Sequence, residues 1–329
     1  MKKLIAMTLA VLMVLAMTVP ALAADDVTVI KLGHACGPNH PYSQGAEKFA
    51  EVLAEKTDGR FSVEIYPEST LGAERDLIEG LQMGSVEMCI VSTAPLSSYS
   101  DALLAFDLPY IFTSTEQARG VCDSEIGRAM LDELPANGIV GLCFFENGFR
   151  HFTNSTRPIV EPADVAGLKI RVMENQVMMR TIEVLGGSPT PMAFNELYTA
   201  LQQGTIDGEE NPVSQIYDKK MYEVQKYMSM SGHFYAPAPL LISSILWDTL
   251  SEEDQAIFME AAEAGRDYMR ERNEIEEQDQ IDYMVEQGVE ICYDVDVDAF
   301  VEAVQPVYDE FVGRLIDADV VEAIQNFEA

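Results

Sequence analysis

One arginine lies where it could bind an anion. In residues 167–172 apolar side chains alternate with polar ones, which places Arg171 on the face of a predicted strand opposite Leu168 and Ile170. In an α/β sheet Arg171 would lie at the carboxyl end of that strand, where ligands bind. Its guanidinium can hold a carboxylate by two parallel hydrogen bonds, and a helix start near Asn175 adds backbone donors. The alternative is that Arg171 pairs with one of the 55 acidic residues.

The chain has no recognisable catalytic or cofactor motif. It contains no G-x-S-x-G, no H-E-x-x-H, no glycine-rich dinucleotide loop and no P-loop. Its cysteines and histidines are too scattered for a metal site, and an odd number of cysteines argues against a disulfide framework. They are Cys36, Cys89, Cys122, Cys143, Cys292, His34, His40, His151 and His233. We therefore expect buried free thiols, no metal, no cofactor and no enzymatic activity.

The amino terminus has the layout of a secretory signal peptide. Lys2 and Lys3 precede an apolar run over residues 4–19, and residues 21–23 form an A-x-A cleavage site. The alternative, a membrane anchor, is disfavoured because the run is short for a bilayer span and ends at Pro20. We predict cleavage after Ala23 and a periplasmic, soluble mature protein.

The charge of the chain excludes several partners. Removing residues 1–23 takes the formal net charge from -34 to -36, because Lys2 and Lys3 are lost with no acid. Such a field repels nucleic acid and anionic lipid and favours a soluble monomer. Any anion site must therefore be a local group of arginines and backbone donors within about a Debye length, ~8 Å at physiological salt.

Strand-like and helix-like segments alternate along the chain. The first series is strand 27–32, helix 43–56, strand 61–65, helix 72–83 and strand 86–91. A helix over 125–134 and a strand over 139–146 follow. A second series begins with strand 168–172 and continues with helix 175–185, an extended piece 188–192, helix 195–202 and a strand near 205–208. This alternation predicts parallel strands in a doubly wound α/β sheet, with the loop over residues 92–98 facing the candidate site.

Two long helices complete the predicted elements. A capping-box-like start at Ser251 and the absence of proline predict one helix over residues 251–288, ~55 Å long at ~1.5 Å per residue. That length spans two lobes, which about 305 mature residues also require. The alternative is a break near Gly265. A last amphipathic helix follows Asp298, with a kink expected at Pro306.

Several segments closely resemble the extracytoplasmic solute-binding subunits of TRAP transporters, the DctP-type family. They are Asn147–Arg150, residues 167–173 and the run from Gly187 to Pro212, with shorter likenesses at residues 69–72 and 106–110. The resemblance covers essentially the whole mature chain. It implies a periplasmic-binding-protein-like fold of two α/β lobes with a hinge, several crossovers and a long helix spanning both. We expect residues 24–147 plus about 236–272 in the first lobe, and 148–235 plus about 273–329 in the second.

The resemblance also assigns roles to residues. It makes Arg171 the clamp of the substrate carboxylate, Arg150 and Asn211 additional polar contacts, and Phe194 an aromatic that lines the cleft. From the residues alone, Arg150 could equally brace the hinge, Asn211 could cap a helix after Pro212, and Phe194 could be ordinary core.

Weaker candidates lie near predicted crossings and strand ends. His34, His40 and Tyr235 are ligand candidates there, although such residues are more often structural. Glu209 departs from the Gln that is usual in the family, and we expect it to point away from the cleft because it would repel a carboxylate. Sialic-acid-binding members carry Glu and Arg where this chain has Ser92 and Pro95, which argues against sialic acid.

Together these features predict a receptor for a small carboxylate, either a sugar acid such as a hexuronate or a C4-dicarboxylate or hydroxy acid. It would deliver this ligand to the membrane permease of a TRAP transporter. The first alternative is a binding protein that reports its ligand to a sensory receptor. The second is an exported enzyme acting on organic acids, for which the sequence offers no nucleophile and base pair.

Overall fold

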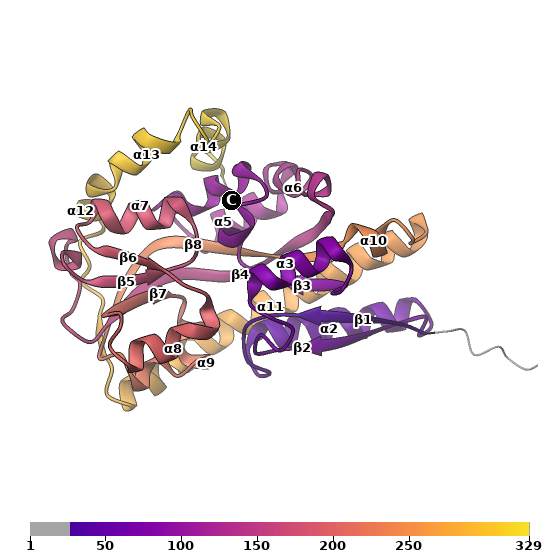
Figure 1. Ribbon diagram of the computed structural model, residues 1–329, viewed down its shortest axis with the longest axis horizontal. Coiled ribbons are helices and arrows are strands. Elements are labelled where there is room, and N and C mark those ends of the chain that lie inside the picture. The colour runs from indigo at the N-terminus through magenta and orange to yellow at the C-terminus, as the bar shows by residue number, and fades with distance from the viewer. Residues whose placement is uncertain (1–26, 329) are drawn as a thin grey trace, which may run out of the picture.

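A computed structural model describes residues 27–328 of the chain (Figure 1). The predicted signal peptide and its cleavage site lie outside these residues. Within them, no helix combines the length and the apolar composition needed to cross a membrane. All five cysteines lie in this part of the chain as free thiols, four of them buried.

Within residues 27–328, nine strands form one mixed sheet that runs through both lobes. Its order is β2-β1-β3-β8-β4-β7-β5-β6, and β9 pairs with β8. The strands are β1 (Thr28–Gly33), β2 (Phe61–Tyr66), β3 (Met88–Ile90), β4 (Ile139–Asn154), β5 (Lys169–Val172), β6 (Ser188–Pro191), β7 (Gly208–Asn211), β8 (Tyr227–Ser243) and β9 (Glu290–Cys292). One end of the sheet belongs to each lobe, and the long strands β4 and β8 pass through both (Figure 1).

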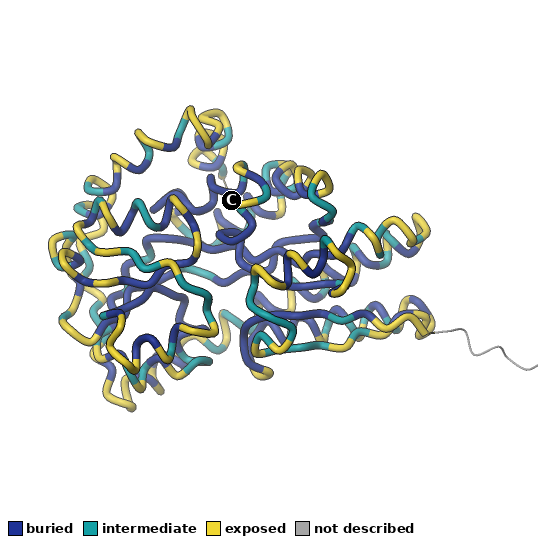
Figure 2. Tube along the Cα trace, in the orientation of Figure 1, coloured by how far each residue is buried: buried dark blue, intermediate teal, exposed yellow. Residues whose placement is uncertain are grey.

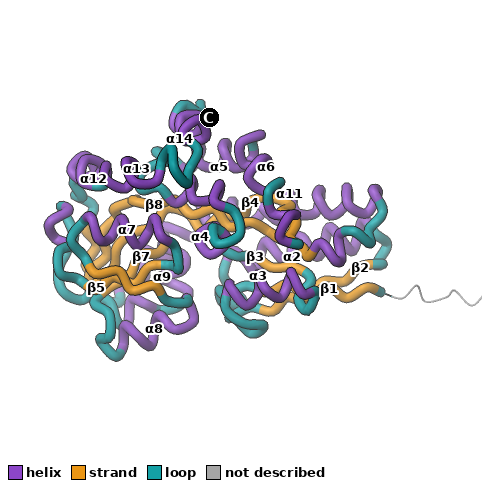
Figure 3. Tube along the Cα trace, turned by 45° about the horizontal axis from the view of Figure 1, so that its top comes forward, coloured by secondary structure: helices purple, strands orange, loops and turns teal. Residues whose placement is uncertain are grey.

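Helices cover both faces of the sheet (Figure 3). The α-helices are α2 (Pro41–Lys56), α3 (Glu74–Met83), α4 (Thr93–Leu96), α5 (Thr115–Asp123), α6 (Glu125–Leu131), α7 (Gln176–Val184), α8 (Phe194–Gln202), α9 (Val213–Asp218), α10 (Ser244–Trp247), α11 (Glu252–Glu286), α12 (Val297–Ala303), α13 (Gln305–Phe311) and α14 (Ala318–Gln325). The 3-10 helices are η1 (Asp101–Asp107), η2 (Leu134–Asn137), η3 (Pro162–Val165) and η4 (Met221–Glu223). The predicted α/β architecture of two lobes is confirmed.

The pairing of the central strands differs from the prediction of parallel strands. The outer groups β2-β1-β3 and β7-β5-β6 are parallel, but β4 pairs antiparallel with β8 and β7, and β3 pairs antiparallel with β8. Sequence patterns also missed β8, which contains Pro237 and Pro239. β3 joins β8 only from Leu240 onward, so the edge of β8 beside both prolines is free of β3. Proline is tolerated at such an edge because no backbone donor is needed there.

Helix α11 is continuous and braces both lobes, as predicted, and the alternative of a break near Gly265 does not occur. It packs on α2 in the first lobe and on α9 in the second. A Cβ added at Gly265 would lie 2.7 Å from the carbonyl oxygen of Gly45, and one at Gly45 would lie 2.9 Å from that of Gly265. The two glycines therefore let the backbones of α2 and α11 touch.

The C-terminal segment bridges the lobes instead of belonging wholly to the second. The predicted kink is a break at Val304, after which α13 begins with Pro306 in its first turn. α13 lies on α7, whereas α14 lies on α6. Gln117 of α5 donates a hydrogen bond to the Ile324 carbonyl at 2.9 Å. The predicted boundary, with about 273–329 in the second lobe, therefore does not hold for α14.

Apolar residues bury both faces of the sheet, while the outer faces of the helices are exposed (Figure 2). One core lies under α2 and α11 in the first lobe, and a second lies under α8, α9 and α11 in the second lobe. A third runs along the opposite face through both lobes, from Leu77 to Ile182 and Phe300. Within β3, Met88 and Ile90 enter one core and Cys89 the other, as strand alternation requires.

Candidate functional site

A cavity lies between the lobes at the carboxyl ends of strands β1, β3, β5 and β7. The first lobe contributes Ala35, Cys36, Tyr42, Glu74 and Ser92, and the other wall is made of Arg150, Arg171, Met173, Phe194, Asn211 and Gln215. Four residues that sequence analysis singled out, Arg150, Arg171, Phe194 and Asn211, are thus brought together.

Arg171 is a buried cation with no carboxylate partner among the described residues. Its Nε and Nη2 donate to the Met192 carbonyl at 2.9 and 2.7 Å. Its Nη1 is buried and makes no hydrogen bond within residues 27–328. The predicted alternative, an ion pair with an acidic residue, is therefore absent from the described part of the chain. A buried donor without a partner is costly, and an acceptor from a ligand would satisfy it.

Arg150 is also buried, but its charge is already neutralised. Its Nε donates to Glu210 Oε2 at 2.5 Å and its Nη2 to Glu210 Oε1 at 3.0 Å. Nη2 also donates to Asn211 Oδ1 at 3.0 Å. Burial alone lowers the pKa of Arg150, but the charge and hydrogen bonds of Glu210 raise it above the ordinary value. Arg150 therefore orients the amide of Asn211 and leaves Arg171 as the uncompensated cation.

Phe194 lies in the cavity wall between two cations. The Arg171 Cζ and the Lys219 Nζ each lie 5.9 Å from the centre of its ring. Phe194 is the first residue of α8, so its side chain is only partly covered by the helix that follows. Cations near a ring face are attracted to it, and here the ring also helps hold Arg171 in place.

The wall of the first lobe presents acceptors and donors that sequence analysis did not assign. Glu74 Oε1 accepts hydrogen bonds from the Ser92 backbone N–H at 2.7 Å and from its hydroxyl at 2.9 Å. The Ser92 hydroxyl accepts in turn from Asn147 Nδ2 at 3.0 Å. Asn147 Oδ1 accepts hydrogen bonds from the Tyr42 hydroxyl and from Gln215. Ser92 begins the loop that was predicted to face the site, whereas Glu74, in the first turn of a surface helix, gave no local signal.

The remaining predicted candidates lie outside this cavity lining and hold the fold. His34 Nε2 lies 3.0 Å from the Ser43 hydroxyl. His40 caps helix α2, its Nδ1 accepting from the Tyr42 N–H at 3.1 Å. Burial lowers the pKa of both histidines to about 3, so they are neutral. Tyr235 donates to Glu146 Oε2 at 2.7 Å.

Several hydrogen bonds connect the lobes around the cavity. The Gly37 N–H donates to Asp218 Oδ2 at 2.8 Å, from the loop after β1 to the end of α9. Asn175, the N-cap of α7, donates to Asp107 Oδ2 at 2.8 Å and to Ser97 Oγ at 3.1 Å. These bonds hold the lobes closed over the cavity.

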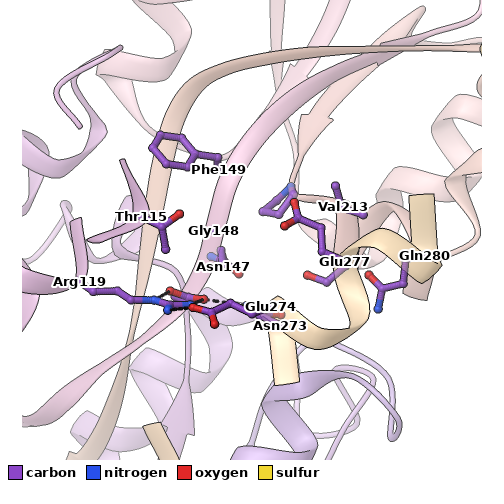
Figure 4. Close-up of a pocket in the computed structure, with 13 residues that line it drawn as sticks. Thr115, Arg119, Asn147, Gly148, Phe149, Val213, Asn273, Glu274, Glu277 and Gln280 are labelled. Atoms are coloured by element: carbon purple, nitrogen blue, oxygen red, sulfur yellow. Dashed lines mark hydrogen bonds and ion pairs between the residues drawn. The ribbon is translucent and has the colours of Figure 1, made fainter. Parts of the chain in front are cut away.

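A second pocket lies where β4 crosses between the lobes, beside α5 and α11 (Figure 4). Here Arg119 donates to both oxygens of Glu146, at 2.7 and 2.6 Å, and pairs with Glu274 of α11. Burial alone raises the pKa of Glu146, but the hydrogen bonds and charge of Arg119 bring it below the ordinary value. The register of β4 and β8 shifts at Gly148, which has φ +106°. At this crossing, the ion pairs of Arg119 tie β4 to α5 and α11. The neighbouring bulge at Gly148 has a backbone conformation that only glycine readily adopts.

The cavity does not resemble a metal centre or a nucleophilic site. No three His, Cys, Asp or Glu side chains within residues 27–328 are placed to hold a metal ion. Burial raises the pKa of the Cys36 thiol well above its ordinary value, so the reactive thiolate is disfavoured. Two lobes closed over a small polar cavity with one uncompensated arginine define a protein that binds a small anionic solute.

Comparison with known proteins agrees with this class. Residues 32–314 match the family model described as bacterial extracellular solute-binding protein, family 7 (DctP). The C4-dicarboxylate-binding periplasmic protein of Rhodobacter capsulatus is 35% identical over 315 residues, 94% of this chain and 93% of the relative. The chain therefore belongs to the DctP family and is a TRAP-type solute-binding protein, not an enzyme.

Solved structures of similar proteins carry sugar acids. A TRAP periplasmic solute-binding protein from Polaromonas sp. JS666, bound to D-erythronate, is 41% identical with a TM-score of 0.90, over 92% of this chain and 99% of that one. The sugar-acid-binding protein of Advenella mimigardefordensis, in complex with galactonate, is 35% identical with a TM-score of 0.87, over 92% and 98%.

Proposed function

We propose that this protein captures a monocarboxylate sugar acid, such as an aldonate or a hexuronate, and delivers it to the membrane permease of a TRAP transporter. The observation that carries the proposal is the buried Nη1 of Arg171, which has no partner in the described structure. A ligand carboxylate can take one hydrogen bond from Nη1 and a second from Nη2, whose other proton already bonds Met192. Asn211 and Arg150 support the same carboxylate from the side.

The charge of the cavity favours one carboxylate over two. Arg150 is neutralised by Glu210, so Arg171 remains as the cation for a ligand. Glu74 stands in the facing wall, and both hydrogen bonds from Ser92 fall on its Oε1. Its Oε2 is left for a ligand hydroxyl, whereas a second ligand carboxylate would meet a like charge. The C4-dicarboxylate bound by the Rhodobacter relative is therefore the weaker candidate here.

The lining of the cavity favours a ligand rich in hydroxyl groups. The side chains of Tyr42, Ser92, Asn211 and Gln215 all face it. Polar groups on both walls suit a chain of hydroxyls, since a buried polar group of the protein needs a partner when water is excluded. Four-carbon and six-carbon sugar acids such as D-erythronate and galactonate meet this requirement.

Delivery to a permease has three expected consequences: export of the protein, a monomeric state and closure of the lobes by ligand. We expect export through the predicted signal peptide with cleavage after Ala23, a monomer, and closure of the lobes by ligand. The walls of the cavity meet through polar bonds such as that from Gly37 to Asp218, and a ligand that contacts both walls would add to them and bias the closed form. A sensory role would use the same site, and it is distinguished by ligand uptake in cells that carry or lack the permease.

Calorimetric titration of the mature protein tests the ligand class. We expect D-erythronate or galactonate to bind more tightly than succinate by at least tenfold. Glu74→Gln should narrow that ratio because it removes the like charge, while the control Glu79→Gln on the exposed face of the same helix should leave it unchanged. Tighter binding of succinate than of both sugar acids to the wild type would refute the monocarboxylate assignment.

A further inference from the structure

Glu209 is a fully buried carboxylate without a cationic partner in the described structure. It has 0% exposure and lies in β7, two residues before the cavity residue Asn211. Its Oε1 accepts from the Thr153 hydroxyl at 2.6 Å and its Oε2 from Asn211 Nδ2 at 2.5 Å. Both partners are neutral. As expected from the sequence, its side chain is not part of the cavity lining, yet it is one hydrogen bond away from it.

The two nearby arginines do not neutralise Glu209. Arg150 gives both arms of its guanidinium to Glu210. Arg171 is the register neighbour of Glu209 on β5, but its Nε and Nη2 donate to the Met192 carbonyl. An ionised carboxylate that is buried without a counter-ion is unstable and tends to take up a proton.

The other titratable groups around Glu209 supply no positive charge. The strands packed around it carry His151 on β4 and His233 on β8. Burial lowers the pKa of His151 to about 4 and that of His233 well below the ordinary value, so both rings are neutral. Asp107 of η1 is also buried, and burial raises its pKa to about 8. Burial likewise raises the pKa of Glu209 to about 7.

The hydrogen bonds around Glu209 suit the protonated acid as well as the anion. The Thr153 hydroxyl lies 2.6 Å from Glu209 Oε1 and 3.3 Å from Gln225 Oε1, and it can donate to only one of them. When Glu209 is protonated on Oε1, the acid donates to Thr153 and Thr153 donates to Gln225. Oε2 still accepts from Asn211, so the ligand site keeps its shape in both states.

We propose that Glu209 is a proton-binding site coupled to the ligand site, so that capture of an organic anion is accompanied by uptake of a proton. This inference rests on the proposed function only in requiring an anionic ligand. With Glu209 ionised, the two positive charges of Arg150 and Arg171 meet four negative charges, those of Glu210, Glu209, Glu74 in the cavity wall and the ligand carboxylate. Protonation of Glu209 removes one of these negative charges and so lowers the electrostatic cost of holding an anion in the closed cavity.

The sign of the coupling follows from linkage. A bound anion and closure of the lobes raise the pKa of Glu209 further, so the complex holds more protons than the free protein. Affinity for the anion therefore rises as the pH falls below the pKa of Glu209 in the complex, by at most about tenfold per pH unit. It levels off once the pH is below the pKa of Glu209 in the free protein. Glu209→Gln mimics the protonated acid, since its amide can donate to Thr153 and its oxygen can accept from Asn211.

Calorimetry with D-erythronate and galactonate as probes tests this coupling. At pH 7.5, titrations in phosphate and in Tris, which differ in ionisation enthalpy, give the number of protons taken up. We expect about 0.5 to 1 proton for the wild type and for Asp107→Asn, and close to none for Glu209→Gln. At pH 8.5, Glu209→Gln should bind at least about threefold tighter than the wild type. A wild type that takes up no proton, or a variant that takes up as many, overturns the proposal.

Thermal unfolding without ligand keeps the test independent of the ligand's identity. The pKa of Glu209 rises from the ordinary 4.5 to about 7 on folding. Its burial therefore favours the folded state at low pH, and this contribution falls as pH rises from 4.5 to 7 and is constant above. The melting temperature of the wild type relative to Glu209→Gln should follow this curve. Parallel profiles would show that Glu209 does not titrate, whereas failure of both acids to bind would count against the proposed ligand class.

Discussion

Replacing Arg171 with alanine should remove most of the affinity for an organic acid while leaving the protein folded. In the wild type, the ligand carboxylate would take hydrogen bonds from Nη1 and Nη2 in a cavity closed to water. Truncating one partner of such a buried charge pair costs ~2 to 5 kcal/mol, roughly 30-fold to several thousand-fold in affinity. The high end applies here because Glu210 already holds Arg150, so no second free cation can compensate.

The variant also loses two hydrogen bonds within the protein. The Met192 carbonyl accepts from Nε at 2.9 Å and from Nη2 at 2.7 Å in the wild type. An unsatisfied buried carbonyl costs about 1–3 kcal/mol, less if water enters the space left by the side chain. We therefore expect a lower melting temperature but a cooperative transition, because the apolar face of β5 is untouched. Thermal unfolding separates this loss of stability from loss of binding.

The assay is calorimetric titration of the folded variant with D-erythronate and galactonate. Arg171→Lys should recover part of the affinity, since an ammonium supplies the charge but not the planar pair of donors. Arg180→Ala is the matched control, because Arg180 lies on the exposed side of α7 and pairs with Glu183 and Glu310. Affinity of Arg171→Ala within threefold of the wild type would refute the carboxylate clamp.

Further predictions concern closure, metals and packing. Small-angle scattering should show a smaller radius of gyration with saturating D-erythronate, and an unchanged profile would contradict hinge closure. Asp218→Ala removes the hydrogen bond from Gly37, so it should increase the radius of gyration of the unliganded protein and weaken ligand binding several-fold. A radius of gyration and an affinity equal to those of the wild type would show that this contact does not hold the lobes together. Excess EDTA should leave affinity unchanged, and a large loss would indicate a metal-bridged carboxylate. Gly265→Ala should lower the free energy of unfolding by ~1–3 kcal/mol in denaturant titration, because its Cβ would meet the Gly45 carbonyl. This loss should exceed the gain from the better helix propensity of alanine. A stabilised variant would refute the argument about close packing of α2 and α11.

The local patterns of the sequence predicted most of the elements correctly. Alternation placed Arg171 on the polar face of a strand. The capping residue Ser251 marked the start of the long helix, and its hydroxyl accepts a hydrogen bond from the Asp254 N–H in the structure. The family motifs brought Arg150, Phe194 and Asn211 to one site. These features depend on residues close together in the chain, and strand or helix periodicity encodes them directly.

Long-range pairing could not be predicted in the same way. The two central strands are antiparallel, and β8 was missed because proline usually argues against a strand. Its prolines are tolerated only because β3 ends its pairing at Leu240, which no local pattern of β8 reveals. Likewise, α14 returns to the first lobe through a contact between Gln117 and Ile324, 207 residues apart.

By itself, the sequence determined the secretory layout, the alternation of strands and helices, the family and the arginine that faces the site. The tertiary structure decided the charge of that site. Glu210 neutralises Arg150 from 60 residues away, Glu74 faces the ligand from the other lobe, and Glu209 is left without a cation. The physical reason is that a charge is set by its neighbours in space, and a buried cavity brings together groups whose separation along the chain carries no signal.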